Sequence, residues 1–136
     1  MCKYTKKKVK INNKPLHYIS SDGFHIYVGK NNLQNDQLTF HFAVGNDWWF
    51  HAKQAPGSHV IVRTNGAELP DTTFEEAARL AAYYSSMRGS DKVEIDYVEK
   101  KQVKKPGGGK PGFVVYYTNY SMVIDSNISQ IRLCAD

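Results

Sequence analysis

Residues 47–59 concentrate two tryptophans, two histidines and a lysine around a Pro56-Gly57 turn. Alternate side chains of a strand point to opposite faces, so Trp49 and His51 would share one face and their aromatic neighbours the other. One of these sets can pack a core, while an aromatic ring beside an imidazole can stack on a nucleobase. The pattern alone leaves open whether Trp49 is buried or binds a base.

A second candidate for chemistry is a polar run, mostly of amide side chains, that follows a predicted strand. It comprises Lys30, Asn31, Asn32, Gln34 and Asn35. Carboxamides both donate and accept hydrogen bonds, which suits the base edges and 2′-hydroxyls of an unpaired RNA strand. The same residues also suit a turn that binds its own backbone, and composition alone favours that alternative.

Basic side chains near these segments are candidates for phosphate binding. The loop at 100–110 is rich in lysine and glycine, so it can follow a phosphate backbone and release counterions. It can equally be a solvated loop kept soluble by its charge. Its glycine run is no nucleotide triphosphate loop, because Pro111 follows Lys110 where a serine or threonine would bind magnesium. Together with one hydroxyl on the turn, the further candidate RNA contacts are Lys53, Ser58, His59, Arg63, Lys104, Lys105 and Lys110.

Other chemistries find less support in the spacing. His51 and His59 flank the turn, but zinc wants three or four ligands and no cysteine or acidic pair stands at suitable spacing. A hydrolase could use Asp47, His51 and Ser58 as acid, base and nucleophile, yet their order matches no catalytic motif. We therefore expect no metal, no cofactor and no catalysis.

The net charge of +5 suggests a polyanionic partner, but the charge is unevenly distributed. Six of the 18 basic residues precede residue 15, and the other 12 stand against 13 acidic residues. Basicity in the folded part must therefore be local, and we expect one acidic face and one basic face. The sequence has no apolar run that could span a bilayer or act as a secretory signal, which predicts a cytoplasmic protein. The two cysteines, near the chain ends, are expected to be free thiols.

Short strands and two helices must position these residues. Residues 73–87 predict the principal helix, with capping residues at its start and Gly89 beyond its end. Residues 36–44 suit either a strand or a short helix capped by Asp36, and we favour the helix. The expected fold class is α+β, with a mostly antiparallel sheet and the principal helix on one face. Apolar and β-branched runs predict strands at 16–19, 24–28, 48–52, 59–63, 93–97, 113–118 and 121–124.

The chain is of single-domain size. We expect residues 1–14 to form a basic flexible arm and residues 15–136 to form one domain, which would be a monomer in isolation.

Ordered motifs run through most of the sequence. They are DGFHIYVGKNNLQNDQLT at 22–39, DWWFH at 47–51 with PGSHV at 56–60, AARLAAYYS at 77–85, and VEIDY at 93–97 followed by VKKP, KPG and a tyrosine up to 116. In this order and spacing they resemble the NFACT RNA-binding domain family. Lys30 stands where the family usually has arginine, which keeps the charge but loses the planar fork that binds phosphate with two hydrogen bonds.

The resemblance implies a non-catalytic RNA-binding module. In the fuller proteins of this family, which act in ribosome quality control and are also described as fibronectin-binding-like, the module helps hold tRNA and the large ribosomal subunit on stalled nascent-chain complexes. Their N-terminal, helix-hairpin-helix and coiled-coil regions have no counterpart in this sequence, so the chain is either a C-terminal module of such a protein or a standalone version. The alternatives are an adhesion or protein-interaction module and, with less support, the small hydrolase.

Overall fold

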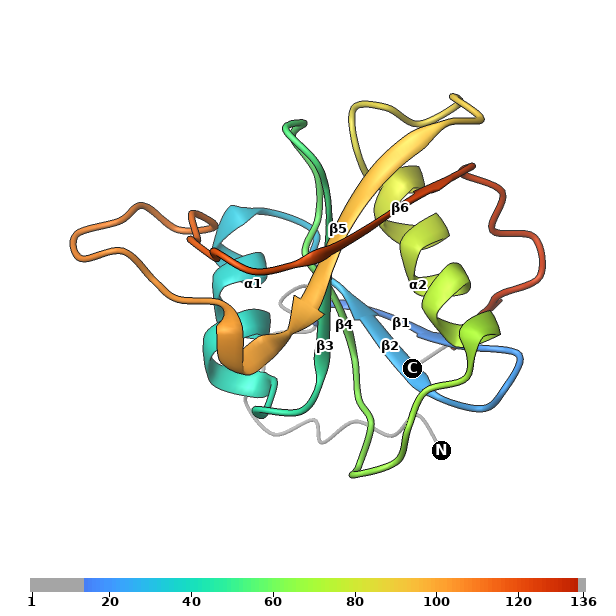
Figure 1. Cartoon of the computed structure of the whole chain (residues 1–136), viewed down its shortest axis with the longest axis horizontal. Helices are drawn as coiled ribbons and strands as arrows, with labels where there is room; N and C mark the ends of the chain where they lie inside the picture. Colours follow the sequence, from blue (N-terminus) through green and yellow to red (C-terminus); the bar gives the residue numbers. More distant parts are fainter. Residues whose placement is uncertain (1–13, 135–136) are drawn as a thin grey trace.

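One antiparallel sheet with a helix packed on each face forms the structure (Figure 1). The computed structural model describes residues 14–134, so the expected flexible arm lies outside the described residues except for Lys14. The strands are β1 (Leu16–Ile19), β2 (His25–Val28), β3 (Trp48–Ala52), β4 (Val60–Val62), β5 (Val93–Glu99), β6 (Tyr120–Ile124) and β7 (Arg132–Leu133). The helices are α1 (Asn32–Gln37), its π-helical continuation η2 (Leu38–Phe42), α2 (Asp71–Tyr83) and the short 3-10 helix η3 (Lys100–Gln102).

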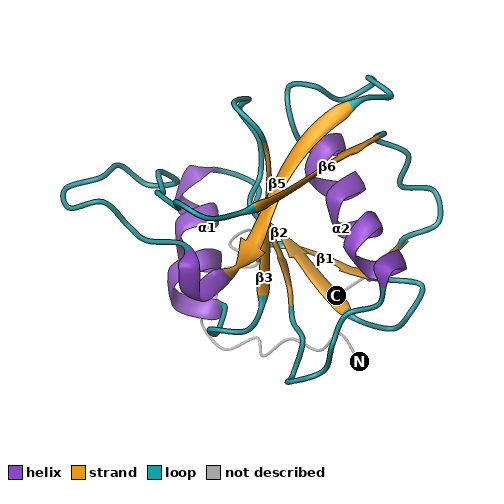
Figure 2. Ribbon diagram, in the orientation of Figure 1, coloured by secondary structure: helices purple, strands orange, loops and turns teal. Residues whose placement is uncertain are grey.

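Seven strands form the sheet in the order β6-β5-β3-β4-β2-β1-β7, with antiparallel pairing throughout (Figure 2). β1 and β2 form the predicted hairpin, and Gly23 in its reversal has a positive φ of 90°. β3 is an interior strand that lies between β5 and β4. These pairings confirm the α+β class and the antiparallel sheet.

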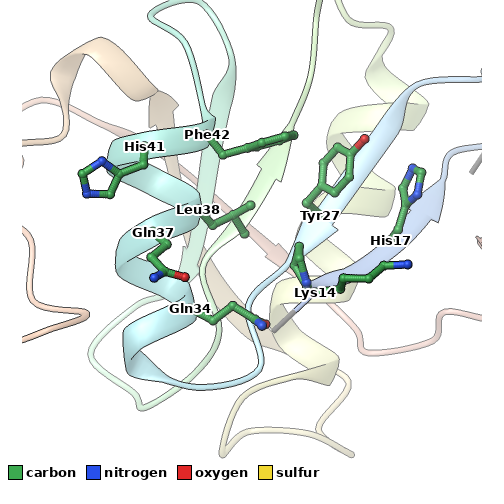
Figure 3. A pocket seen from close by; sticks show the side chains of 9 residues that line it. Lys14, His17, Tyr27, Gln34, Gln37, Leu38, His41 and Phe42 are labelled. Atoms are coloured by element: carbon green, nitrogen blue, oxygen red, sulfur yellow. The ribbon is translucent and has the colours of Figure 1, made fainter. Parts of the chain in front are cut away.

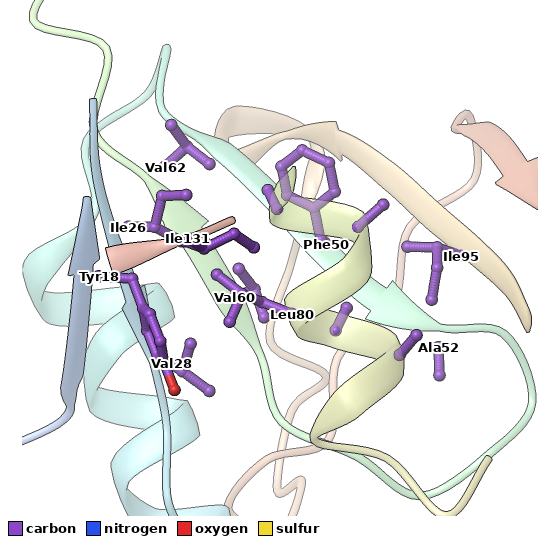
Figure 4. Close-up of a cluster of buried hydrophobic side chains, with 14 of the residues drawn as sticks. Tyr18, Ile26, Val28, Phe50, Ala52, Val60, Val62, Leu80, Ile95 and Ile131 are labelled. Atoms are coloured by element: carbon purple, nitrogen blue, oxygen red, sulfur yellow. The ribbon is translucent and has the colours of Figure 1, made fainter. Parts of the chain in front are cut away.

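Strand β3 is buried on both of its faces. Phe50 and Ala52 face α2 and belong to the larger hydrophobic core, where the alanines of α2 lie close against the sheet (Figure 4). Trp49 points the other way and is covered by Leu38 of η2 and by Val103. The alternation predicted from the sequence is therefore confirmed, but a second covering layer buries the face that the sequence left open.

The first helix begins four residues earlier than predicted. The Asn31 side chain accepts a hydrogen bond from the Gln34 backbone N–H at 2.8 Å, so Asn31 is the N-cap in place of Asp36. The helical segment then runs to Phe42 and not to residue 44. Between the two open interpretations, strand or helix, the structure confirms the helix.

The principal helix spans Asp71–Tyr83 and is shorter than the predicted 73–87. Pro70 is the N-cap and has no polar side chain to cap the helix, while the hydroxyl of Thr73, a residue within the first turn, donates to the Asp22 carboxylate at 2.8 Å. At the other end, the backbone N–H of Ser58 donates to the Tyr84 carbonyl oxygen at 2.9 Å. The 56–58 turn thus binds the Tyr84 carbonyl oxygen, which would have accepted a hydrogen bond within the helix if the helix had continued.

The C-terminal part of the chain departs most from the predictions. Residues 113–118 form no strand, and their regular backbone pairing is limited to a bridge between Lys104 and Val115. Strand β7, which no pattern predicted, adds to β1 at the edge of the sheet. Cys134 is disulfide-bonded, so the expectation of a free thiol is wrong at that position.

Replacing Trp49 with alanine should lower the free energy of unfolding by about 3–5 kcal/mol, because the ring fills the centre of the second core. Trp49→Phe should cost less, since the buried indole N–H has no hydrogen-bond partner within residues 14–134. Urea denaturation followed by circular dichroism measures both changes. The exposed Leu33→Ala should stay within about 0.5 kcal/mol of wild type. A loss below about 1 kcal/mol for Trp49→Ala would contradict the two-core description.

Candidate nucleic-acid interface

The end of β2, the start of α1 and the start of β4 meet at Gly29. A Cβ atom on this glycine would lie 2.0 Å from the Asn35 Oδ1 atom, so only glycine fits. The same Oδ1 accepts a hydrogen bond from the His59 backbone N–H at 3.1 Å. The Ser58 hydroxyl donates to the Gly29 carbonyl oxygen at 2.5 Å. Local sequence thus fixes a close three-way junction at this edge of the sheet.

Most of the amide run serves this junction and not a ligand. Gln34 and Asn35 are both buried. The Gln34 Oε1 atom accepts from the Lys30 backbone N–H at 2.8 Å, and the Asn31 side chain caps α1. Burial gives no support to the predicted base contacts of Gln34 and Asn35, and the backbone-binding turn that composition favoured is found. Lys30, Asn31 and Asn32 remain exposed.

The loop after η3 is anchored on α1 through Lys105. Its Nζ atom forms an ion pair with Asp36 Oδ1 at 2.5 Å and donates to the carbonyl oxygens of Lys110 and Phe113 at 2.6 and 3.2 Å. Partial burial opposes the ionisation of Asp36, but Lys105 and the Gly112 N–H outweigh it and lower the pKa of that carboxyl. Lys105 is therefore largely committed to the loop itself, whereas Lys104 and Lys110 are exposed.

His59 is buried beneath this loop. Its Nε2 atom lies 3.1 Å from the Gly112 carbonyl oxygen, which can only accept, so Nε2 carries the proton and Nδ1 accepts from the Thr39 hydroxyl at 2.8 Å. Burial lowers the pKa of His59 to about 3, and the neighbouring His51 acts in the same direction. A neutral, buried imidazole offers no positive charge to a phosphate, so the structure gives no support to the phosphate contact predicted for His59.

Trp49 and His51 also lie inside the molecule's second layer. Only 1% of Trp49 is exposed, and its ring packs against His59 and Tyr116 at centroid distances of 5.4 and 4.9 Å. His51 is half-buried, and burial lowers its pKa despite the opposing backbone carbonyls of Ala52 and Gly57. Because both faces of β3 are covered, the structure gives no support to the predicted stacking of Trp49 on a base.

Two of the predicted phosphate contacts are engaged elsewhere. Lys53 lies 3.4 Å from Asp96 and 3.8 Å from Glu94. Arg63 sits at the opposite end of β4 from the turn, where its Nε atom pairs with the buried Asp47 at 3.1 Å. Carboxylates therefore balance both charges, and neither side chain joins the Gly29 junction.

The helix α2 supplies groove residues that the sequence reasoning missed. Its C-terminal end packs on the 56–58 turn, where a Cβ on Gly57 would lie 2.9 Å from the Ser85 Cβ. A groove of about 400 Å³ runs between that end and the start of α1. Its polar lining includes Lys30, Asn31, Asn32, Ser58, Ser85, Ser86 and Arg88, with Tyr83 and Tyr84 beside them. We refer to it as the basic groove.

The basic groove escaped prediction because the helix was expected to continue through residue 87. The paired serines at 85 and 86 are poor helix-interior residues and could have marked the earlier end. Arg88 lies over the Tyr83 ring, with its guanidinium carbon 3.7 Å from the ring centroid. No acidic residue lines this groove, so its charged groups, Lys30 and Arg88, are both positive.

A second depression, of about 450 Å³, lies between η2 and strands β1 and β2 (Figure 3). Leu38, Tyr27 and Phe42 give it a mainly apolar wall, and Lys14 stands at its border. Lys14 is the first described residue and precedes β1 by two positions.

The hydrolase alternative finds no assembled catalytic set. The Asp47 carboxylate binds Arg63 and the backbone N–H groups of Val44 and Thr64. His51 faces backbone carbonyls, and the Ser58 hydroxyl is committed to Gly29. Within residues 14–134 there is no group of three or more histidine, cysteine or acidic side chains that could hold a metal ion, and no helix long and apolar enough to cross a membrane.

This geometry defines a class of protein, a small antiparallel α+β module with a groove at one end of its sheet that no acidic side chain lines. The chain matches the NFACT protein RNA binding domain over residues 14–118. It belongs to this family, as the ordered motifs predicted.

Three relatives illustrate the relationship. The Rqc2 homolog RqcH of Streptococcus suis (strain 05ZYH33) is 49% identical over 112 residues, which cover 82% of this chain and 20% of that protein. RqcH of Bacillus subtilis (strain 168) is 44% identical over 119 residues, covering 87% of this chain and 20% of that protein. The solved structure of the C-terminal part of the fibronectin/fibrinogen-binding protein from Streptococcus suis has a TM-score of 0.83 and 42% identity, covering 96% of this chain and 52% of that chain. The chain thus spans about a fifth of the length of these curated relatives.

Acid should destabilise the fold through His59. Its pKa is about 3 in the folded chain and 6.5 as a free side chain, so between these values only the unfolded chain binds the proton. Stability contributed by neutral His59 is therefore present above pH 6.5 and is lost as the pH falls, by about 2 kcal/mol between pH 7 and pH 5. Urea unfolding at both pH values should show a smaller loss for His59→Gln than for wild type, while exposed His41→Gln should behave as wild type.

Equal pH dependence of wild type and His59→Gln would contradict the buried neutral imidazole. If the glutamine variant does not fold, NMR titration of the His59 ring in wild type decides the question, with no titration expected above pH 5.

Proposed function

We propose that the basic groove and the adjoining 104–113 loop bind RNA, and that this chain is a non-catalytic RNA-binding module. The observation that carries the proposal is that Lys30 and Arg88 line a polar groove without any acidic residue, although the chain from residue 15 onward has more acidic than basic groups. Local positive charge with hydrogen-bonding amides and hydroxyls suits a phosphate backbone and its sugars. The family's description supports the same reading.

The two exposed lysines of the loop extend this surface. Gly112 packs against Asn32, since a Cβ there would lie 3.0 Å from the Asn32 Oδ1 atom. The loop therefore borders the start of α1, and Lys104 and Lys110 add exposed charge on the α1 side of the sheet. Phosphate contacts accordingly fall to Lys30, Arg88, Lys104 and Lys110, whose ammonium and guanidinium groups release counterions on binding.

On this proposal the side chain that stacks on a base is Phe113 and not the buried Trp49. This ring follows Gly112, is 60% exposed, and lies in the loop that Lys105 anchors. An exposed aromatic side chain beside cationic groups provides the stacking platform typical of single-strand binding.

The relatives support a more specific proposal for the function. The curated relatives described above are Rqc2 homologs, and on this proposal the module engages tRNA and the large ribosomal subunit in ribosome-associated quality control in the cytoplasm. The name of the Streptococcus suis structure offers the alternative of fibronectin or fibrinogen binding. We favour RNA because the charge pattern of the basic groove fits a polyanion.

Titration with labelled tRNA at two salt concentrations tests the polyanion surface. Lys30→Glu and the double variant Lys104→Glu/Lys110→Glu should weaken binding several-fold, and each lost phosphate contact should reduce the salt slope by about 1. Arg132→Glu is the matched control, because Arg132 is exposed at the opposite end of β1 from Gly29. No tRNA binding at low salt, or binding to fibronectin in its place, would overturn the proposal.

Phe113→Ala should reduce affinity for a short single-stranded RNA by about 1–3 kcal/mol, the usual value of one stacked base. Its salt slope should stay at the wild-type value, since no charge is removed. Fluorescence anisotropy with a labelled oligonucleotide measures both quantities, with Leu33→Ala as the exposed apolar control. Unchanged affinity for Phe113→Ala would remove Phe113 from the interface.

A further inference from the structure

Four aromatic rings gather around a depression at the N-terminal end of α2. Trp48 packs against Phe74 at 4.9 Å between centroids, and against Tyr97 and Tyr120 at 5.9 and 6.0 Å. Phe74 and Tyr120 each lie 5.6 Å from Tyr97. The depression that they border measures about 450 Å³, and Tyr120 is 59% exposed. The cluster is therefore an open surface and not an enclosed core.

A second depression, of about 480 Å³, adjoins the first and shares Trp48 and Phe74 with it. Four carboxylates line the two depressions, and neither has a lysine, arginine or histidine in its lining. These carboxylates are Asp71, Glu75, Glu68 and Glu99. We refer to the two depressions together as the acidic aromatic groove.

The carboxylates of this groove are mostly free of basic partners. Glu99 has an ion pair with Lys101 at 3.3 Å, while no ion pair within residues 14–134 involves Asp71, Glu75 or Glu68. The cation–π pairs among the described residues involve the rings of Phe40, Phe42 and Tyr83, none of which belongs to the groove. Aromatic faces and negative charge are thus presented together, and among residues 14–134 Lys101 is the one cation that pairs with a carboxylate of the groove.

We propose that the acidic aromatic groove binds an arginine- or lysine-bearing segment of a partner protein. Cations bind over aromatic faces, and most strongly over tryptophan, when carboxylates nearby supply the opposite charge. Two depressions with a common wall at Trp48 and Phe74 can take two cationic side chains of one chain. RNA is unsuited to this surface, because its phosphates would face four carboxylates.

The edge of the sheet favours an extended segment as the occupant. Strand β6 contributes Tyr120 and Met122 to the groove and ends the strand order, pairing only with β5 among the described residues. With no second strand beside β6 among the described residues, a peptide can add along this edge as a further strand, with side chains reaching the groove. Burial and the nearby Tyr120 and Asp71 raise the pKa of Tyr97, so its ring stays a neutral phenol.

This proposal is independent of RNA binding, since the two grooves lie at opposite ends of α2. The acidic aromatic groove takes Asp71 and Glu75 from the first turns of the helix, and the basic groove takes Tyr83 from the last. Thirteen helical residues separate the two ends by about 20 Å. Both ligands can therefore bind at once.

Isothermal titration with an acetylated and amidated oligo-arginine peptide tests the groove in the full 136-residue chain. Asp71→Asn/Glu75→Gln and Tyr120→Ala should each weaken binding roughly 5-fold or more. The matched controls, Asp91→Asn for charge and Phe113→Ala for an exposed ring, should stay within about twofold, because neither residue lines the groove. In NMR spectra the amide shifts on peptide addition should cluster at Trp48, Phe74 and Tyr97.

Three results would overturn the proposal. They are failure of the wild-type chain to bind the peptide, equal weakening by Asp91→Asn and the groove variants, and amide shifts centred away from Trp48. The tRNA affinity of Tyr120→Ala should remain at the wild-type value. Phe113→Ala should conversely weaken RNA binding and leave peptide binding unchanged. Wild-type binding of tRNA without binding of the peptide would overturn this proposal alone, and binding of the peptide without binding of tRNA would overturn the RNA proposal alone.

Discussion

The buried imidazole of His59 is the contact on which the end of the molecule around the Gly29 junction depends. A neutral imidazole has one donor and one acceptor, so the Gly112 carbonyl and the Thr39 hydroxyl fix its orientation and protonation together. The backbone N–H of the same residue is held by Asn35. One residue thus joins strand β4, helix α1, its continuation η2 and the basic loop. The hydrogen bonds of His59 are made by uncharged groups inside the protein, whereas Lys30 and Lys110 are exposed at the surface.

Helix α2 separates charge as well as covering the sheet. Carboxylates cluster at its N-terminal end and Arg88 follows its C-terminal end, which is the arrangement that the helix dipole stabilises. A domain with almost no net charge after residue 14 can in this way present one groove lined by positive charge and another lined by negative charge. Net charge alone therefore says little about its partners, whereas the position of each group along α2 says a good deal.

Prediction succeeded where the signal was local. Alternation placed β1 to β5 and the β1–β2 reversal close to their observed positions, because side-chain period and glycine conformation are properties of a few adjacent residues. It failed at both helix ends, but for different reasons: the cap at Asn31 is a local hydrogen bond from Gln34 that competed with the cap expected at Asp36, whereas the stop after Tyr83 depends on a hydrogen bond from the 56–58 turn. It left the burial of Trp49 open, because nothing near that residue shows that residues 103–116 fold back over it.

The sequence by itself determined the fold class, the family and the polar segment that contributes to the basic groove. Only the tertiary structure decided which of those polar groups are free to bind a partner. His59 and Gly112 are 53 residues apart in the chain, as are Ser20 and Thr73, so their hydrogen bonds leave no mark on local composition. An amide, hydroxyl or imidazole is equally suited to hold the backbone or a ligand, and the packing of distant segments selects between the two.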